Sequence, residues 1–148
     1  RDFIVCNIYF KKYFKMLIRT KNKIIEKNAK LCSNIFSKFI GLMFSKKQNN
    51  TLIFKFNREK TVSLHMIFVF YPIDVLFLNK SKIVVDKKEN FKPFTFCKSK
   101  RKAMYVIEMP NGIIKKTKTG IGDKIEFYSE WNFLIRILNN ESKRHAKR

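Results

Sequence analysis

The sequence contains little glycine, proline or alanine and few acidic residues. Its 148 residues include 4 Gly, 3 Pro and 3 Ala, so a collagen-like or low-complexity chain is excluded. Only 11 Asp and Glu stand against 33 Lys and Arg, which gives a formal net charge of +22. Hydrophobic residues nevertheless make up 45% of the chain, and 16 residues are Phe. This apolar content is sufficient for a packed core in one domain and excludes disorder of the whole chain.

The excess of lysine has two explanations. Lys (26), Ile (18), Phe (16) and Asn (13) all have A/T-rich codons, so base composition alone raises their number. The acidic residues have not risen with them, and the resulting positive surface attracts polyanions in a salt-dependent way. Residues 16–138 keep 25 basic and 9 acidic residues, a net charge of +16. The charge is therefore spread over the domain, and we expect weak, non-specific binding of nucleic acid.

Cysteines and long apolar runs are both scarce. Cys6, Cys32 and Cys97 are odd in number and form no CxxC pair, which is unlike a disulfide scaffold or a zinc site. They are typical of reduced, buried side chains in the cytosol. The longest apolar stretch without a charge covers 13 residues, 61–73, and is too short to span a bilayer. We therefore predict a cytoplasmic protein without a transmembrane segment, a metal or a cofactor.

Three regions are predicted along the chain. Met16 is the first methionine, and we expect residues 1–15 to be an extension of a domain that covers 16–128. Residues 129–148 are predicted to form a C-terminal helix and a basic tail, because their apolar residues follow a helical spacing. A second short helix is expected over residues 33–44.

The central region reads as a series of short strands separated by turns. Pro110 and Gly112 end one strand, and Gly122 and Asp123 form a tight turn that favours positive φ at glycine. Residues 87–102 are predicted to be a basic loop. The predicted strands cover residues 16–32 as a hairpin, 51–56, 62–78 interrupted at a proline, 83–86, 103–109 and 124–128. The expected fold is α+β and predominantly β, a single small domain with an antiparallel β-barrel or sandwich-like sheet and one or two short helices.

Several segments, taken in order, resemble the DUF192 family, which is also called UPF0127. They are Gly41-Leu42-Met43, the run HMIFVFYPIDVLFL that starts at His65, Lys92-Pro93-Phe94, the run AMYVIEMPNG that starts at Ala103, and Gly122-Asp123. The resemblance covers roughly residues 16 to 127 and implies a small β-rich fold with minor helices. It implies no particular activity.

One run is most similar to the archaeal branch of that family. Bacterial members more often have Trp-Met-Lys-Asn-Thr where this chain has His-Met-Ile-Phe-Val. This chain therefore has the apolar residues Ile67, Phe68 and Val69 where bacterial members have Lys, Asn and Thr. It cannot carry out any chemistry that those polar side chains perform.

Three side chains are candidates for catalysis. His65 lies on a predicted strand, and a catalytic histidine needs a carboxylate partner that sets its tautomer. Asp74 and Glu108 each interrupt an apolar stretch, so each must be hydrogen-bonded or lie at a strand end. The alternatives are that Asp74 caps the turn after Pro72 and that Glu108 pairs with a nearby cation.

The expected binding site is a small pocket where the end of the helix predicted over residues 33–44 meets the stretch that starts at His65. Its predicted residues are Gly41, Leu42, Met43, His65, Met66, Pro72 and Asp74. No nucleotide-binding loop or hydrolase elbow is present in the sequence.

Aromatic residues precede the densest basic cluster, residues 98–102. Phe91, Phe94 and Phe96 beside these cations fit the binding of single-stranded nucleic acid. Alternate phenylalanines also fit a strand that packs on the core, and we favour core packing. We therefore expect a non-enzymatic binding or accessory module for a small ligand or protein partner. Polyanion binding through the basic surface and a hydrolase-like activity of His65 with Asp74 or Glu108 are the alternatives.

Overall fold

The structure, a computed structural model, describes residues 15–21, 23–32 and 51–129. Within these residues the chain forms nine strands and one short helix, α2. The elements are β1 Lys15–Thr20, β2 Lys23–Cys32, β3 Leu52–Lys60, β4 Ser63–His65, β5 Ile73–Leu78, β6 Val84–Phe91, β7 Phe96–Lys98, β8 Ala103–Pro110, α2 Ile113–Thr117 and β9 Ile125–Ser129.

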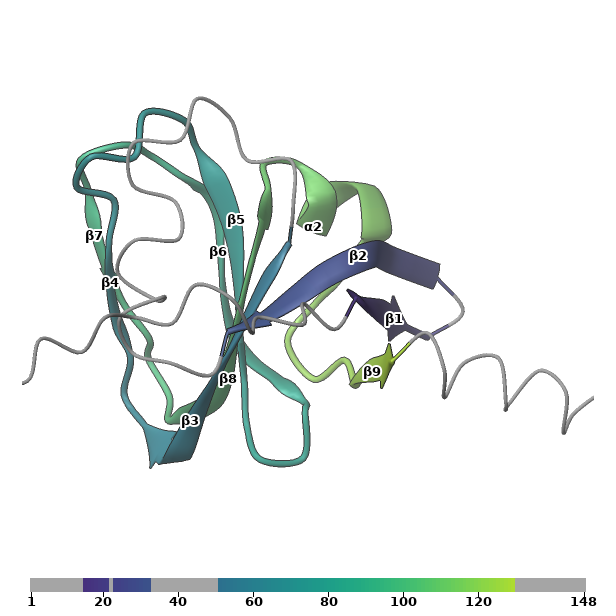
Figure 1. Ribbon diagram of the computed structural model, residues 1–148. Coiled ribbons are helices and arrows are strands. Elements are labelled where there is room, and N and C mark those ends of the chain that lie inside the picture. The colour runs from purple at the N-terminus through teal and green to yellow at the C-terminus, as the bar shows by residue number, and fades with distance from the viewer. Residues whose placement is uncertain (1–14, 22, 33–50, 130–148) are drawn as a thin grey trace, which may run out of the picture.

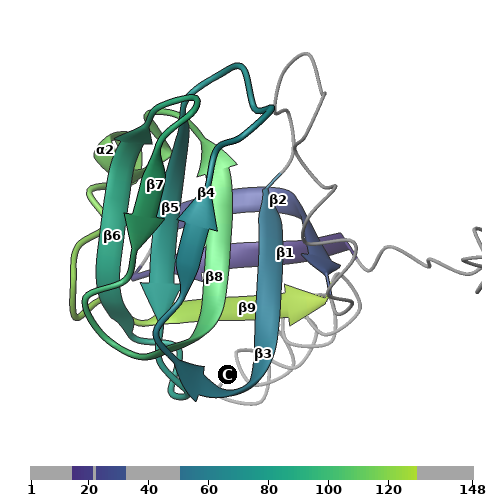
Figure 2. The same cartoon turned by 90° about the vertical axis from the view of Figure 1, so that its left-hand side faces the viewer.

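Seven of these strands form one curled sheet in the order β6-β5-β8-β3-β2-β1-β9. Its two edge strands meet at one end, where Val84 N–H donates to Asp123 O and Ile125 N–H donates to Lys82 O, both at 2.9 Å. The sheet therefore forms a half-barrel, in which β2, β1 and β9 cross behind the other four strands (Figure 2). Closing an edge in this way protects strand groups that would otherwise pair with another chain.

The remaining strands, β4 and β7, form a separate two-stranded sheet. This sheet covers one face of β6, β5, β8 and β3, whereas α2 lies on the other face with β1, β2 and β9 (Figure 1). The predicted β-rich, single-domain fold is confirmed. Its sheet is mixed, because β2 and β3 pair in parallel while the other neighbours are antiparallel.

Two cores lie on opposite faces of the large sheet. All six residues of β5 are buried, because each face of the strand packs against one of the two cores. For this reason the sequence of β5 is a nearly continuous apolar run. The barrel core, on the α2 side, comprises Ile18, Ile25, Ala29, Ile53, Leu76, Leu78, Val84, Ile107, Met109, Ile114 and Ile125. The cover core, under β4 and β7, comprises Leu52, Phe54, Val62, Met66, Val69, Ile73, Val75, Phe77, Phe91, Ala103 and Val106.

The prediction of a loop over residues 87–102 is wrong in part. β6 continues to Phe91, and β7 occupies Phe96–Lys98 within it. The sequence pattern did not indicate the second half of β6, because β6 is an edge strand. Its charged side chains face solvent and interrupt the apolar alternation. The helices predicted over 33–44 and after Ser129 lie outside the described residues.

The predicted turn residues occupy the following positions. Pro110 is the last residue of β8 and pairs with Ile73 of β5. Gly112 and Gly122 have φ of 89° and 91°, a backbone conformation that glycine adopts without the steric cost of a side chain.

Candidate binding surface

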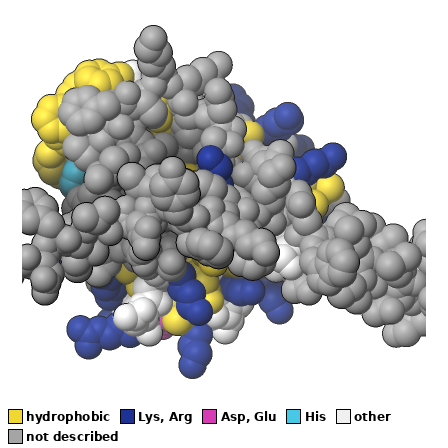
Figure 3. Space-filling view, in the orientation of Figure 1, with side chains coloured by type: hydrophobic (Ala, Val, Ile, Leu, Met, Phe, Trp, Pro, Cys, Tyr) yellow, Lys and Arg dark blue, Asp and Glu magenta, His cyan; other side chains and the backbone are white. Residues whose placement is uncertain are grey.

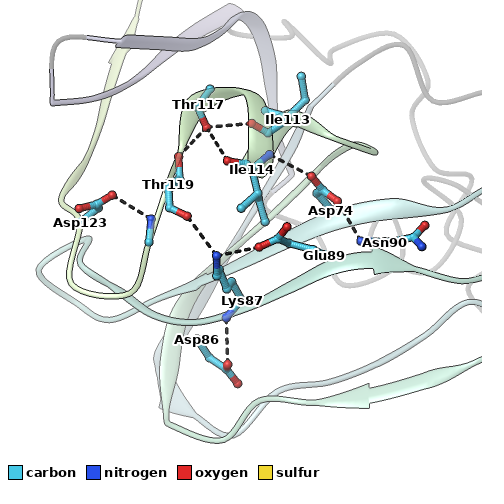
Figure 4. A network of polar contacts seen from close by, with 11 residues as sticks. Asp74, Asp86, Lys87, Glu89, Asn90, Ile113, Ile114, Thr117, Thr119 and Asp123 are labelled. Carbon is cyan, nitrogen blue, oxygen red and sulfur yellow. Dashed lines mark hydrogen bonds and ion pairs between the residues drawn. The ribbon is translucent and has the colours of Figure 1, made fainter.

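Asp74 is buried at the start of β5, and both of its carboxylate oxygens accept backbone hydrogen bonds. Oδ1 accepts from the N–H of Asn90 at 3.0 Å, and Oδ2 accepts from the N–H of Ile114 at 2.9 Å (Figure 4). The side chain thus joins β5 to the end of β6 and to the first turn of α2. These bonds offset the cost of burying a carboxylate, so the geometry assigns Asp74 a structural role.

A second group of polar contacts continues along the same side of the molecule (Figure 4). Lys87 Nζ donates to Glu89 Oε1 at 2.7 Å and to Thr119 O at 3.4 Å. Asp123 Oδ2 accepts from the N–H of Gly120 at 2.9 Å, which holds the turn before β9. These contacts fasten the segment after α2 to β6.

His65 lies on the other side of the large sheet. It is the last residue of β4, where Leu64 packs towards the cover core and His65 is exposed. Its register partner is Phe96 of β7, and the two rings are 6.5 Å apart between centroids. The structure therefore separates His65 from Asp74, whose contacts are with α2 and β6.

The predicted pocket is divided in the same way. Met66 is buried in the cover core, and Pro72 is half-buried in the loop that leads to β5. Asp74 faces the α2 side instead, because it alternates with neighbours that belong to the cover core. Residues 41–43 lie outside the described residues.

Glu108 is the candidate carboxylate on the same side of the sheet as β4 and β7. In register it lies between Leu52 of β3 and Val75 of β5, both of which belong to the cover core. Burial raises the pKa of Glu108 from its ordinary 4.5 to about 8, because removal from water disfavours the charged carboxylate. The raised pKa follows from the position of this carboxyl group between the apolar side chains of the cover core.

Four exposed phenylalanines lie around β4 and β7, and we call Phe68, Phe70, Phe94 and Phe96 the aromatic patch. Their exposed fractions are 44%, 59%, 59% and 73%. Phe70 and Phe94 contact edge to face, with ring centroids 5.6 Å apart. Figure 3 shows hydrophobic side chains gathered at this end of the molecule, with a histidine at their edge. Contiguous exposed aromatic side chains are typical of interaction surfaces.

The backbone of Met66 holds the two loops that carry the aromatic patch. Its N–H donates to Thr95 O at 2.9 Å, and its carbonyl accepts from Phe94 N–H at 3.0 Å and from Val69 N–H at 3.2 Å. Phe68 and Phe94 have positive φ, 59° and 57°, a conformation that is costly for bulky residues. The surrounding hydrogen bonds maintain this strained arrangement, so the rings are presented by ordered loops.

The basic loop, residues 98–102, is also fixed by hydrogen bonds to its main chain. Asp86 Oδ2 accepts from the N–H of Lys100 at 2.7 Å. Ser99 N–H donates to Val62 O at 2.8 Å, and Val62 N–H donates to Ser99 Oγ at 3.0 Å. The buried polar side chains Asp86 and Ser99 thereby hold the basic loop against β6 and the start of β4.

The predicted packing of three phenylalanines on the core is correct for one of the three residues. Phe91 is buried in the cover core, whereas Phe94 and Phe96 are exposed. The alternation was read as one strand, but the chain turns at residues 92–95 between β6 and β7. The proline at position 93 and the cations that follow were the available signals that this turn faces solvent.

Other kinds of site find no support in the part of the chain that the structure describes. There, no group of three or more His, Cys, Asp or Glu side chains is placed to hold a metal ion. Cys97 is half-buried, and burial raises its thiol pKa, which makes the reactive thiolate less available. Among the described helices none has the length and apolar character required to cross a membrane.

The fold and its surface define a class: a small, basic half-barrel domain with a two-stranded cover sheet that carries exposed aromatics. The profile of the DUF192 family, described as "Uncharacterized ACR, COG1430", matches residues 16–127. A UPF0127 protein of Pyrococcus furiosus is 39% identical over 122 residues, which cover 81% of this chain and 100% of that protein. A UPF0127 protein of Thermococcus sibiricus is 38% identical over 118 residues, 78% of this chain and 76% of that protein. The chain belongs to the DUF192 (UPF0127) family, and these relatives are archaeal.

Two solved structures share the fold. A candidate transcription regulator of Sinorhizobium meliloti aligns with a TM-score of 0.71 and 22% identity, over 78% of this chain and 95% of its own. A protein of unknown function from Novosphingobium aromaticivorans aligns with a TM-score of 0.67 and 19% identity, over 74% and 83%. At these identities the likeness establishes the fold alone.

Proposed function

We propose that this protein is a non-enzymatic binding module and that the aromatic patch is its binding surface. The observation that carries the proposal is the presentation of four exposed phenylalanines, three on loops that the Met66 backbone holds in place and one at the start of β7. Exposed aromatic rings in water are unfavourable unless they meet a ligand or partner. Ordered rings also lose little conformational freedom on binding, which favours affinity.

The placement of Asp74 supports a binding role over a hydrolase that pairs it with His65. Both oxygens of Asp74 accept backbone hydrogen bonds, so this carboxylate is not aimed at a substrate. His65 faces outwards beside Phe96, where its ring extends the aromatic patch. A histidine in that position contributes a flat ring and a hydrogen-bonding edge to a ligand.

The predicted cytoplasmic location and the predicted domain limits form part of this proposal. Reduced, half-buried Cys97 suits a reducing compartment. Residues 16–128 would form the binding domain. The predicted contribution of residues 41–43 to the site stays a prediction.

The proposal is tested by native mass spectrometry of the full chain purified from its own cells. We expect a retained ligand or partner on the wild-type protein and its loss from the double variant Phe70→Ser/Phe94→Ser. Ile121→Ser is the matched control, because Ile121 is 63% exposed but lies in the turn before β9. Retention by the double variant, or repeated preparations of wild-type protein without any retained species, would contradict the proposal.

A further inference from the structure

We infer that the aromatic patch and the cations beside it bind single-stranded nucleic acid. The inference rests on the proposed function and names its ligand class. It combines the ring exposure described above with the local charge and with the arrangement of side chains on the outer face of β4 and β7.

The two segments that carry the aromatic patch are basic, and the nearby carboxylate of Asp86 is buried against the main chain of Lys100. Residues 61–72 and 91–102, which carry the patch, contain five Lys and Arg and no Asp or Glu. All five cations are exposed, and they are Lys92, Lys98, Lys100, Arg101 and Lys102. A ligand that covers the rings therefore enters a positive local field, which favours a polyanion.

The outer face of the two-stranded sheet alternates a ring with a cation. Phe96 and Lys98 are both exposed, while Cys97 between them packs towards the cover core. Across the strand pair Phe96 lies opposite His65, and Lys98 lies opposite Ser63. One face thus offers two flat rings on which bases can stack. Two residues further along, a cation and a hydroxyl are placed to contact the phosphate backbone of the nucleic acid. Proteins hold single strands with this combination of stacking platforms and cations.

The basic loop is ordered in the same way as the rings. The main chain of Lys100 is tied to Asp86, and Ser99 is tied to Val62 by two hydrogen bonds. The side chains that follow in the loop start from a fixed backbone. Less freedom is then lost when they contact phosphates.

The same observations disfavour the other ligand classes. Duplex DNA is read by a helix or a two-stranded ribbon that enters a groove. The helix among the described residues has five residues and lies on the opposite side of the large sheet. The strands β4 and β7 have three residues each, and one face of their sheet packs on the cover core. A protein partner is disfavoured because lysine is depleted at the centre of protein interfaces. A bilayer would have to bury His65 and Lys98 together with Phe96, since all three share one face.

The test is fluorescence anisotropy of the full chain with fluorescein-labelled dT12 and U12 and with a 12-base-pair duplex. We expect one or both single strands to bind more tightly than the duplex. The substitution Phe96→Ser is expected to weaken single-strand binding about tenfold, because each stacked base contributes substantially to affinity. The matched controls Ile121→Ser and Lys115→Gln, on the 120–123 turn and on α2, are expected to change it less than about twofold.

Three results would overturn the inference. One is equal binding of duplex and single strands, with Phe96→Ser unchanged, which is the pattern of non-specific charge attraction. Another is the absence of single-strand binding at 50 mM salt. The third is co-sedimentation with vesicles of phosphatidylcholine and phosphatidylserine in the absence of single-strand binding. If the native complex contains a protein or small molecule that the double variant loses, the inference fails while the proposed function stands.

Discussion

The N–H of Phe94 donates a 3.0 Å hydrogen bond to the carbonyl of Met66. Met66 is buried in the cover core, and Phe94 is exposed at the surface. The bond therefore links the packing of the core to the placement of the aromatic patch. Changes at Met66 are expected to affect both stability and binding.

Truncation of Met66 tests that link. Met66→Ala is expected to lower the free energy of unfolding by about 2–4 kcal/mol, because it leaves a cavity in the cover core. Urea denaturation followed by circular dichroism measures the loss. Ile121→Ala, at an exposed position, is expected to change stability by less than about 0.5 kcal/mol. Equal stability of the two variants would show that the Met66 side chain does not contribute to the packing of the cover core.

Replacement of Asp74 tests its structural role. Asp74→Asn puts an amide N–H₂ opposite one of the two backbone N–H donors, from Asn90 or Ile114. The expected loss of unfolding free energy is about 2–4 kcal/mol, because a buried donor is left unsatisfied. Thermal and urea unfolding measure it. A variant with unchanged stability would contradict the structural assignment and reopen a chemical role.

Glu108 is expected to make stability depend on pH. Its folded pKa, about 8, lies above the ordinary value of 4.5, so the folded state binds the proton more tightly than the unfolded state. The contribution is fully present below pH 4.5 and is lost as the pH rises towards 8. We expect wild-type protein to lose about 2–4 kcal/mol more than Glu108→Gln over this range. Parallel pH profiles of the two proteins, from urea denaturation, would refute the prediction.

Asp123 is expected to act in the opposite direction. The Gly120 N–H first, and then the Lys21 ammonium 2.9 Å away, lower the pKa of Asp123 below its ordinary 3.8. Its stabilising contribution is therefore present above pH 3.8 and is lost as the pH falls through the folded pKa. Asp123→Ala should destabilise the protein more at pH 6 than at pH 3, in chemical denaturation. Lys21→Ala should cost less than about 0.5 kcal/mol, because the lysine side chain is 70% exposed.

How far the sequence predicts this structure depends on how local each signal is. The run around β5 identified a buried strand and the family, because every side chain there packs on one of the two cores. The partners of Asp74 were not predictable, since Ile114 is 40 positions away in the sequence. The parallel pairing of β2 and β3 was missed for a similar reason: it depends on the long connection between them and not on residue alternation.

The aromatic patch shows the same limit at the candidate site. Phe91 and Phe96 are only five positions apart in the sequence, yet Phe91 is buried and Phe96 is 73% exposed. The turn between β6 and β7 separates them, and its geometry depends on hydrogen bonds to Met66, about 28 positions upstream of Phe94. Composition indicated a positive surface, but only the fold shows that Lys98 and Phe96 share the outer face of the two-stranded sheet with His65.

The most direct measurement of the central claim is an NMR titration of ¹⁵N-labelled full chain with dT12. We expect the largest shifts of backbone amides at residues 63–70 and 93–102, with little change on α2 and β9. We also expect Phe96→Ser to reduce these shifts strongly at the same dT12 concentration. Shifts spread evenly over exposed lysines, or centred on α2, would contradict the claim that the aromatic patch is the binding surface.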